Sequence, residues 1–380
     1  MNLEYGVTLL VLLYALYGVI KLFNLYRKTR DLQFLTLLSV VAVVGLDAAM
    51  ILFGNKGMSW FSRFHYLFAL LPLLVFAVCM HLGKVRSRAV SDQVMLRNAF
   101  HPYLAESALE RLAIDFEQVK LSGEKKALTI LHCNIKGFRL LSEKLGPEEL
   151  VHLLNMYLSE LSEVVLRHQG TLDKYLGDEL WAFWGAPLVV ENQNLLACEA
   201  AFALTKRLKQ LRGDWEKKGF PRIDIHIGLG FGKAVVGNMG SNRRFDYSIV
   251  GYPARVAKVL SRLNKTYGTN ILISETLKDS VKGRFVFREV DWVVMGKKRP
   301  FKVYEILDLM EEAPKYERFL EVYGSALGSY HKREWLKAKS LFEEAGRLRK
   351  SEGVCKVYLD RIKGFIHSPP SKDWDGVVRL

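Results

Sequence analysis

Cysteine is scarce in this sequence, and its four copies, Cys79, Cys133, Cys198 and Cys355, lie far apart. Their separations match neither a disulfide framework nor a metal-ligand spacing, so reduced, structural thiols are expected. Acidic residues are also few, 40 against 55 Lys and Arg, which leaves a formal net charge of +15. The basic residues do not collect in one run. A surface beside anionic lipid explains them better than nucleic acid binding, so no nucleic acid partner is predicted.

Long apolar runs are confined to the first 83 residues, in the segments Tyr5–Asn24, Gln33–Phe53 and Phe64–Leu82. Each is close to the ~20 residues that a helix needs to cross a bilayer. The first lacks a small-residue cleavage site and is followed by two more, which argues against a removable signal peptide. Lys and Arg gather at the first connection and after the third segment. The positive-inside bias therefore predicts a multi-pass protein of the inner or plasma membrane, with its N-terminus outside and everything after Gly83 in the cytoplasm.

Composition divides the chain into four predicted parts. Residues 1–83 are expected to form a three-helix transmembrane domain, and residues 84–124 a polar, helix-prone connector. Residues 125–308 mix strand-like and helical patterns. Residues 309–380 predict a small helical tail, in which Tyr316–Leu348 looks like a single tetratricopeptide-type hairpin; one such repeat is too short for an independent solenoid.

The most informative stretch is Thr171–Trp184, in which two strand-like runs flank a Gly-Asp turn. This pattern predicts a hairpin with the carboxylate of Asp178 at its tip. Strict alternation places Lys174 on the same face as Leu172 and Leu176. Such a lysine is either a stem reaching the edge of the sheet or a group that lines a ligand pocket, and the spacing alone leaves both alternatives open.

The order of elements predicts an α+β fold of the ferredoxin-like βαββαβ type, with helices on one face of the sheet. The predicted elements are a strand at Ala127–Asn134, a helix at Pro147–His168, the hairpin, a helix at Gln193–Lys217 and a strand at Arg222–Gly232. The last strand alternates apolar and polar residues, so it is expected to be half-buried, with His226 at the surface or in a groove.

Four motifs carry a resemblance to a known family. They are GDELWAFWGAP, GLGFGKAVVGNMGS at 228–241, FDYSIVG at 245–251 and MGKKRPFKVYEI at 295–306. Together with the DKYLGD hairpin they resemble the catalytic domain of class III adenylate and guanylate cyclases, over residues 125–308. The resemblance implies the class III cyclase fold, conversion of ATP to cyclic AMP and pyrophosphate, and a two-metal site for Mg or Mn. It also implies a dimer with shared active sites, either a homodimer or a heterodimer with another cyclase subunit.

The resemblance also implies roles for single residues. Lys174 and Ser248 fall on the purine-contacting positions, a combination that indicates adenine rather than guanine. Asp178 falls on one of the two metal-binding aspartates, whereas Asn134 occupies the other position. An amide oxygen brings no negative charge and is a poorer ligand for a hard cation, so metal binding is expected to be weakened.

Transition-state stabilisation in the family depends on an Asn and an Arg spaced i, i+4 on the helix after FDYSIVG. Those positions fall on Arg255 and Val259, so neither catalytic residue is matched. Arg255 is the candidate catalytic cation at the asparagine position. The apolar residues Leu180, Trp181 and Phe183 either contribute to the dimer surface that the family implies or fill the core under the sheet.

Three hypotheses follow. The first is a degenerate, regulatory cyclase module that binds a purine nucleotide, and this one is favoured. The second is an active adenylate cyclase whose site is compensated by Arg255, by manganese or by a complementary subunit. The third is a non-enzymatic membrane receptor that uses the cyclase fold for dimerisation, against which the retained Lys174, Ser248 and Asp178 argue.

Overall fold

The computed structural model describes residues 17, 20–21, 100–101, 103–105, 108–110, 123–241, 244–296, 298–349 and 352–380. The chain divides into two compact units, Met1–Arg97 and Asn98–Leu380, and nearly all of the described residues belong to the second. Apart from three positions, the predicted membrane segments lie outside the described residues. Among the described residues, no helix has the length and apolarity that crossing a membrane requires.

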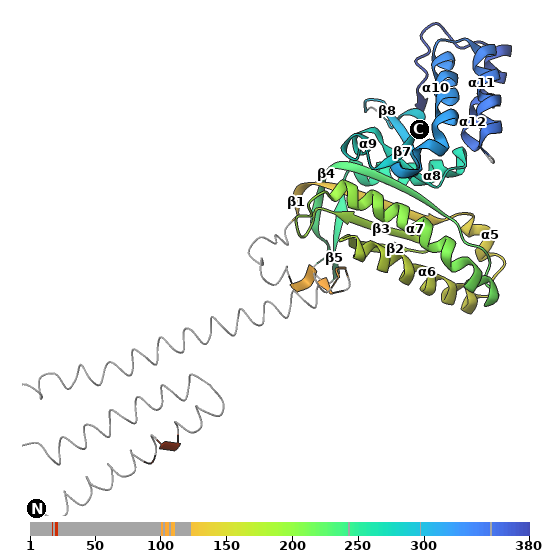
Figure 1. Cartoon of the computed structure of the whole chain (residues 1–380). Helices are drawn as coiled ribbons and strands as arrows, with labels where there is room; N and C mark the ends of the chain where they lie inside the picture. Colours follow the sequence, from red (N-terminus) through yellow and green to blue (C-terminus); the bar gives the residue numbers. More distant parts are fainter. Residues whose placement is uncertain are drawn as a thin grey trace, which may run out of the picture. The chain divides into compact units, whose positions relative to one another are not determined.

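The predicted βαββαβ unit is present. It consists of β1 (Glu124–Ile135), α6 (Pro147–Arg167), β2 (Thr171–Leu176), β3 (Glu179–Trp184), α7 (Gln193–Lys217) and β4 (Ile225–Ser241), with a short α5 (Phe138–Ser142) after β1. These strands lie in the order β2-β3-β1-β4, and their direct neighbours are antiparallel. This is the ferredoxin-like arrangement, and it confirms the predicted fold of this part (Figure 1).

Further elements extend the sheet beyond β4. They are β5 (Arg244–Val250), α8 (Tyr252–Tyr267), β6 (Ile271–Ser274), α9 (Glu275–Ser280), β7 (Phe285–Val294) and β8 (Phe301–Leu309). β5 forms a hairpin with β4, and β6 pairs parallel to β4 after the α8 crossover. Over the described residues the strand order is β2-β3-β1-β4-β6-β8-β7-β9, with β5 paired to β4.

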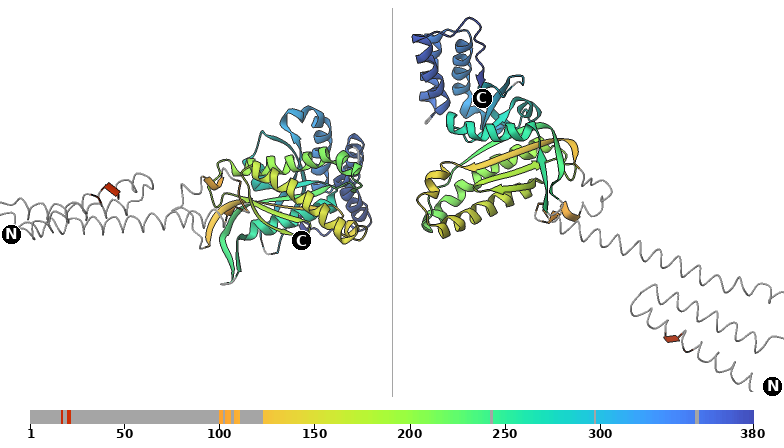
Figure 2. Two further views of the ribbon diagram at one scale, coloured as in Figure 1. Left: turned by 90° about the horizontal axis from the view of Figure 1, so that it is seen from below. Right: turned by 180° about the vertical axis from the view of Figure 1, so that it is seen from behind.

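Helices cover both faces of the sheet, which corrects the prediction of helices on one face (Figure 1, Figure 2). α6 and α7 pack on the face that bears Leu131, Ile227 and Leu229. α8 packs on the opposite face, where a Cβ on Gly228 would lie 2.0 Å from a backbone oxygen of α8 and one on Gly230 would lie 2.5 Å from another. Two residues without side chains therefore let the α8 backbone lie directly on β4.

The same packing overturns the expectation of a half-buried strand. All six residues from Ile225 to Gly230 are buried, because α8 covers the face that carries the polar and glycine positions. His226 is only 4% exposed and is not a surface or groove residue. The alternation of apolar and polar residues was real, but the second face is covered by a helix rather than by water.

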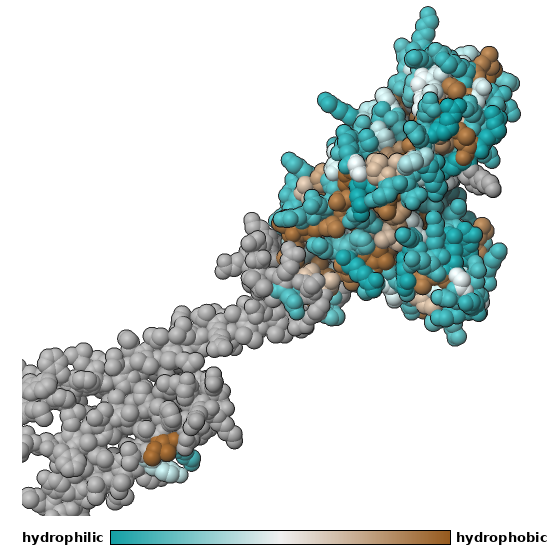
Figure 3. Space-filling model, viewed as in Figure 1, coloured by the Kyte–Doolittle hydropathy of each residue, from teal (hydrophilic) through white to brown (hydrophobic). Residues whose placement is uncertain are grey.

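The tail consists of η2 (Met310–Tyr316), α10 (Glu317–His331), α11 (Trp335–Leu348), α12 (Gly353–His367) and β9 (Val378–Arg379). Its buried residues form one cluster with residues of α8, β7 and β8, so it shares a core with the sheet. β9 pairs with the edge of β7. On the face shown in Figure 3, most of the coloured surface is polar. Among the described tail residues, the exposed large apolar side chains are those of Met310, Leu336, Leu348, Ile366 and Leu380.

Two buried networks fasten the tail to the sheet. Arg288 on β7 pairs with Glu305 on β8 and with Glu352, which directly precedes α12. Asp291 accepts hydrogen bonds from Tyr267 at the end of α8 and from Arg361 on α12, the latter at 2.7 Å. Because a charge in such a place is costly unless paired, these contacts tie the end of α8 firmly to the tail.

Candidate functional site

A β-bulge shapes the strand that carries the predicted lysine. The pairing of β2 with β3 shifts register between Leu172 and Lys174, so Asp173 has no partner on β3. Leu172 belongs to the core under α6 and α7, whereas Lys174 extends toward β5 on the other side of the sheet. The prediction that Lys174 shares a face with Leu172 is therefore wrong, because the extra residue reverses the alternation.

Lys174 and Ser248 lie together although 74 residues separate them. The Lys174 Nζ donates a hydrogen bond of 2.8 Å to the Ser248 Oγ. The Lys174 side chain is 48% exposed, so its ammonium lies at the surface, and Ser248 is nearly buried in β5. The fold thus brings together the two residues that the sequence pattern assigned to purine contact.

Asp173 is a third member of this cluster and was not predicted. Its side chain is 1% exposed, and its Oδ2 lies 3.3 Å from the Lys174 Nζ. Burial raises the pKa of Asp173, while the Ser248 hydroxyl and the Lys174 ammonium oppose that rise. The only sequence signal was an acidic residue inside a strand, directly before a lysine, where strict alternation gave it no special place.

The two predicted metal-ligand positions lie at the end of β1 and at the β2–β3 turn. Asp178 accepts a hydrogen bond of 2.8 Å on its Oδ2 from the backbone N–H of Ile135, and burial raises the pKa of its carboxyl group. Asn134 directs its Oδ1 toward α8, where it accepts a hydrogen bond of 2.6 Å from the Ser261 hydroxyl. Each group thus has an oxygen already engaged within the protein.

These residues do not fit a two-ion site. Two hard cations need several charged oxygen ligands, and the two expected positions offer one carboxylate and one amide. Within the part of the chain that the structure describes, no group of three or more His, Cys, Asp or Glu side chains is arranged to hold a metal ion. We therefore derive no reaction step through Mg or Mn.

Helix α8 carries the predicted transition-state positions. Arg255 is exposed. Val259 packs against the cluster shared by α8, β7 and the tail, so its place is structural in this chain. The neighbouring Lys258 is engaged as well, because its Nζ lies 3.2 Å from the Glu179 Oε2. Of these cations, Lys258 is therefore occupied by Glu179, and Arg255 remains as the catalytic candidate on this helix turn.

A buried histidine lies next to these groups. His132 on β1 is 1% exposed, and its Nε2 lies 3.1 Å from the Glu179 Oε2. Burial lowers the pKa of His132 to about 4, although Glu179 acts in the opposite direction. Its ring packs edge-on against Trp181.

Leu180 and Phe183 are fully buried within the domain. They are core residues of one protomer, so they give no support to a dimer surface.

The described residues of the connector pack beside the Lys174 cluster. The ring of Phe100 lies edge-on to Tyr247, with centroids 5.0 Å apart. The backbone N–H of Leu172 donates a hydrogen bond of 2.9 Å to the carbonyl oxygen of Tyr103. These contacts tie the connector to the strands that carry Lys174 and Ser248.

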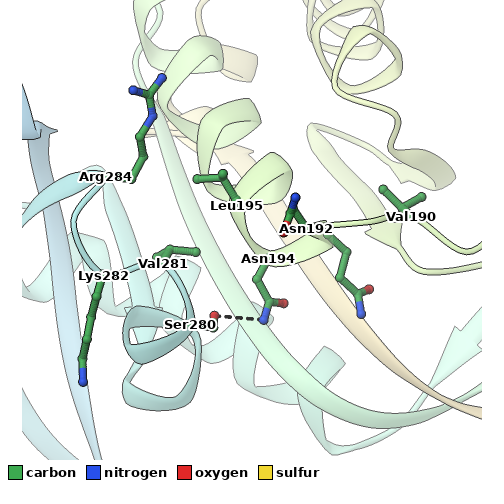
Figure 4. Close-up of a pocket in the computed structure, with 9 residues that line it drawn as sticks. Val190, Asn192, Asn194, Leu195, Ser280, Val281, Lys282 and Arg284 are labelled. Carbon is green, nitrogen blue, oxygen red and sulfur yellow. Dashed lines mark hydrogen bonds between the residues drawn. The ribbon is translucent and has the colours of Figure 1, made fainter.

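A separate cavity of about 390 Å³ lies between the start of α7 and the segment after α9 (Figure 4). Asn194 crosses it by donating a hydrogen bond of 2.9 Å to the Ser280 hydroxyl. Lys282 and Arg284 point away from the cavity, and Arg284 pairs instead with Glu199 and Glu311. The cavity therefore lacks the converging charges of an anion site.

Comparisons with known proteins agree with the cyclase resemblance. Residues 121–308 match the family model described as "Adenylate and Guanylate cyclase catalytic domain". The chain is 31% identical over 187 residues to "Adenylate cyclase 1" of Rhizobium meliloti (strain 1021), covering 49% of this chain and 28% of that protein. It is 27% identical over 240 residues to "Adenylate cyclase" of Anabaena cylindrica, covering 60% and 45% respectively. The chain thus spans less than half the length of either relative.

Among solved structures, the chain is similar to the adenylyl cyclase CyaB from P. aeruginosa, with 33% identity and a TM-score of 0.46. The match covers 50% of this chain and 97% of that one. The sequence match over residues 121–308 coincides with the segment in which the motifs and the βαββαβ unit lie. This segment of the chain belongs to the adenylate and guanylate cyclase catalytic domain family.

Proposed function

We propose that the cyclase domain binds a purine nucleoside triphosphate, ATP in preference, and serves as a catalytically degenerate, regulatory member of its family. The observation that carries the proposal is the 2.8 Å hydrogen bond between Lys174 and Ser248. These are the two residues that the family pattern assigns to the base. The two side chains make contact because the β-bulge turns Lys174 toward β5. Folding of the domain alone does not require a lysine and a serine at these two positions.

The pair has the chemistry to read a purine edge. The Lys174 ammonium only donates hydrogen bonds, which suits a ring nitrogen. The Ser248 hydroxyl accepts as well as donates, which suits an exocyclic amine beside that nitrogen. Because the Lys174 side chain is 48% exposed, a base can reach its ammonium without unfolding the strand.

Turnover is expected to be weak because the groups that would act on the phosphates are altered. Val259 takes the place of an arginine and packs against the tail cluster, and Asn134 takes the place of a metal-binding aspartate. Arg255, at the asparagine position, is the one catalytic candidate left on α8. Loss of one preorganised electrostatic group typically lowers a rate by ~10²–10³. Binding of Mg or Mn is expected to be weakened for the same reason, since Asp178 is the one carboxylate at the two positions.

The proposal includes a dimer and a membrane anchor. In the family pattern the base-contacting residues of one subunit meet the metal-binding residues of the other, so either a homodimer or a heterodimer with another cyclase subunit would complete the site. Residues 1–83 would hold the protein in the inner or plasma membrane with its N-terminus outside, residues 84–124 would connect to the cytoplasmic domain at 125–308, and residues 309–380 would form the tail. The apolar segments and the distribution of Lys and Arg support this topology.

Binding of a non-cyclisable ATP analogue to the full-length protein tests the nucleotide assignment. Lys174→Ala should weaken the affinity by at least ~10-fold, because a charge-assisted hydrogen bond is lost. Lys233→Ala is the matched control, since Lys233 is an exposed lysine of β4 outside the cluster. Equal affinities for wild type and Lys174→Ala would contradict the proposed base contact.

A further inference from the structure

One glutamate of the hairpin gathers three nitrogen atoms around a single oxygen. Glu179 is the first residue of β3 and directly follows Asp178. Its Oε2 accepts hydrogen bonds from the Lys258 Nζ at 3.2 Å and from the Trp181 Nε1 at 3.3 Å. The His132 Nε2 lies 3.1 Å from the same oxygen without the alignment of a hydrogen bond. The carboxylate is therefore surrounded by its own sheet, through β1 and β3, and α8 brings Lys258 to it.

Lys258 is the member of this cluster that a ligand can reach. Its side chain is 30% exposed, whereas that of His132 is 1% exposed. The Lys258 ammonium lies over the ring of Trp181, 5.5 Å from the ring centroid. An ammonium group donates up to three hydrogen bonds, and Glu179 accepts one of them. Lys258 thus faces solvent on one side and the carboxylate on the other.

The cluster lies at the phosphate end of the candidate site. Lys258 belongs to α8 and directly precedes Val259, one of the two positions that the family pattern assigns to the transition state. Glu179 directly follows Asp178, one of the two metal-ligand positions. A cation in this place suits the oxygens of a phosphate, because hydrogen bonds between charged groups are the strong ones. Glu179 offers the same kind of acceptor from within the protein.

We propose that Lys258 is a phosphate-contacting residue of the nucleotide site and that Glu179 inhibits this contact by holding its ammonium. A triphosphate has to displace the carboxylate before it meets the ammonium, so the loss of the Glu179–Lys258 pair offsets part of the gain. The inference rests on the proposed function, since it concerns the phosphates of the same nucleotide. It adds to the altered metal and transition-state positions a second reason for weak handling of the phosphates.

The domain contains a second cluster of the same composition, which provides an internal control. Glu289 on β7 lies 2.9 Å from the Lys302 Nζ and accepts a hydrogen bond of 2.7 Å from the Trp292 Nε1. The Lys302 ammonium lies over the Trp292 ring, 4.8 Å from its centroid. Lys302 is also 30% exposed, and Glu289 is 22% exposed against 19% for Glu179. The two pairs are alike in chemistry and exposure, but the second lies outside the positions assigned to base, metal and transition state.

The test measures binding of inorganic triphosphate to the full-length protein. Glu179→Gln keeps the size of the side chain but removes its charge, which frees the Lys258 ammonium for the anion. The affinity for triphosphate should rise at least ~10-fold over wild type, because a contact between two charged groups becomes available. Glu179→Ser, a second variant without the charge, should show the same gain. Glu289→Gln removes one negative charge from the control cluster and should stay within ~2-fold of wild type.

A further pair of variants assigns the gain to Lys258. Lys258→Met keeps an unbranched side chain without the ammonium. Lys258→Met alone and Lys258→Met combined with Glu179→Gln should bind triphosphate within ~3-fold of each other, because Glu179 then has no ammonium to hold. Circular dichroism of the same samples shows that each variant is folded.

Three outcomes overturn the inference. They are no gain in folded Glu179→Gln or Glu179→Ser, an equal gain in Glu289→Gln, and a gain that persists when Lys258 is replaced. Inorganic triphosphate has no base, so these outcomes leave the contact of Lys174 and Ser248 as proposed. Equal affinities of wild type and Lys174→Ala for the ATP analogue would instead contradict that contact and not the role of Lys258.

Discussion

The two ends of the candidate site differ in what has been kept. At the base end, Lys174 and Ser248 form the contact that the family pattern leads one to expect, with a buried carboxylate beside them. At the phosphate end, Asn134 is bonded to Ser261, and Val259 packs against the tail cluster. Under the proposed function, recognition and chemistry are separated within one domain, because each set of residues depends on different parts of the fold.

The phosphate end is also the more firmly braced of the two. Helix α8 is held on one side by β4, at Gly228 and Gly230, and at its end by the network of Tyr267, Asp291 and Arg361. No tail residue belongs to the cluster of Lys174, Ser248 and Asp173. Changes in the tail network should therefore affect stability without altering base preference.

The largest effect is expected for Asp291→Ala, which removes the acceptor between Tyr267 and Arg361. Breaking a buried ion pair from one side typically costs about 3–5 kcal/mol, because the other charge stays behind unpaired. Chemical denaturation of the full-length protein measures this loss. Asp214→Ala, which removes an exposed pair with Lys217 on α7, should cost less than about 1 kcal/mol.

Nucleotide binding should also be measured for wild type and Asp291→Ala, under conditions in which both proteins are folded. The ratio of the affinities for non-cyclisable ATP and GTP analogues should equal that of wild type in Asp291→Ala. A changed ratio would show that the tail reaches the base end, contrary to the separation described above.

The next largest effect concerns the missing chemistry. Asn134→Asp, Arg255→Asn and Val259→Arg together should raise cyclic AMP formation by at least ~10², since each restores an electrostatic group of the family pattern. Single changes should do little, because such groups act as one unit. Val259→Arg also replaces an apolar contact with the tail cluster, so a folded but inactive triple variant would mean that this position no longer faces the site.

A smaller effect on the free energy of unfolding is expected when the pH is lowered. Burial holds the pKa of His132 near 4, below its ordinary value of about 6.5, so the unfolded chain binds more protons between these values. Stability contributed by the neutral ring is therefore present above about pH 6.5 and is lost as the pH falls toward 4. By pH 5 the loss amounts to about 2 kcal/mol.

His132→Phe removes this titration and should reduce the fall in unfolding free energy between pH 7 and pH 5. The share contributed by His226, whose pKa burial also lowers to about 4, should remain. The control is His367→Phe, at an exposed position on α12, which should follow wild type. If His132→Phe loses stability with acid as steeply as wild type does, the histidine is already charged in the folded protein, or Glu179 holds it in that state.

Local sequence patterns predicted most of the elements. The hairpin strands and helix α7 begin and end where periodicity and turn residues place them, and α6 differs by one residue at its end. The pairing of Lys174 with Ser248 was predicted only through the family resemblance, since a separation of 74 residues leaves no local signal.

What the sequence did not reveal depends on contacts between distant parts. The bulge at Asp173 cannot be recognised in the sequence of β2, whose residues alternate as in a regular strand. In the structure it moves every residue after it to the opposite face of the sheet. The burial of His226 follows from α8 covering β4, and the packing of Val259 follows from the cluster that α8, β7, β8 and the tail share. The sequence around His226 does not indicate that α8 covers it, and the sequence around Val259 does not indicate which elements pack against it.

The central claim is that the base end works while the phosphate end does not. Its most direct test is cyclic AMP and cyclic GMP production by full-length wild type, with magnesium and with manganese, in a sample shown to bind the non-cyclisable ATP analogue. Lys174→Ala serves as the background. The account predicts nucleotide binding with no product above that background for either metal. Product formation that depends on Lys174 would contradict it.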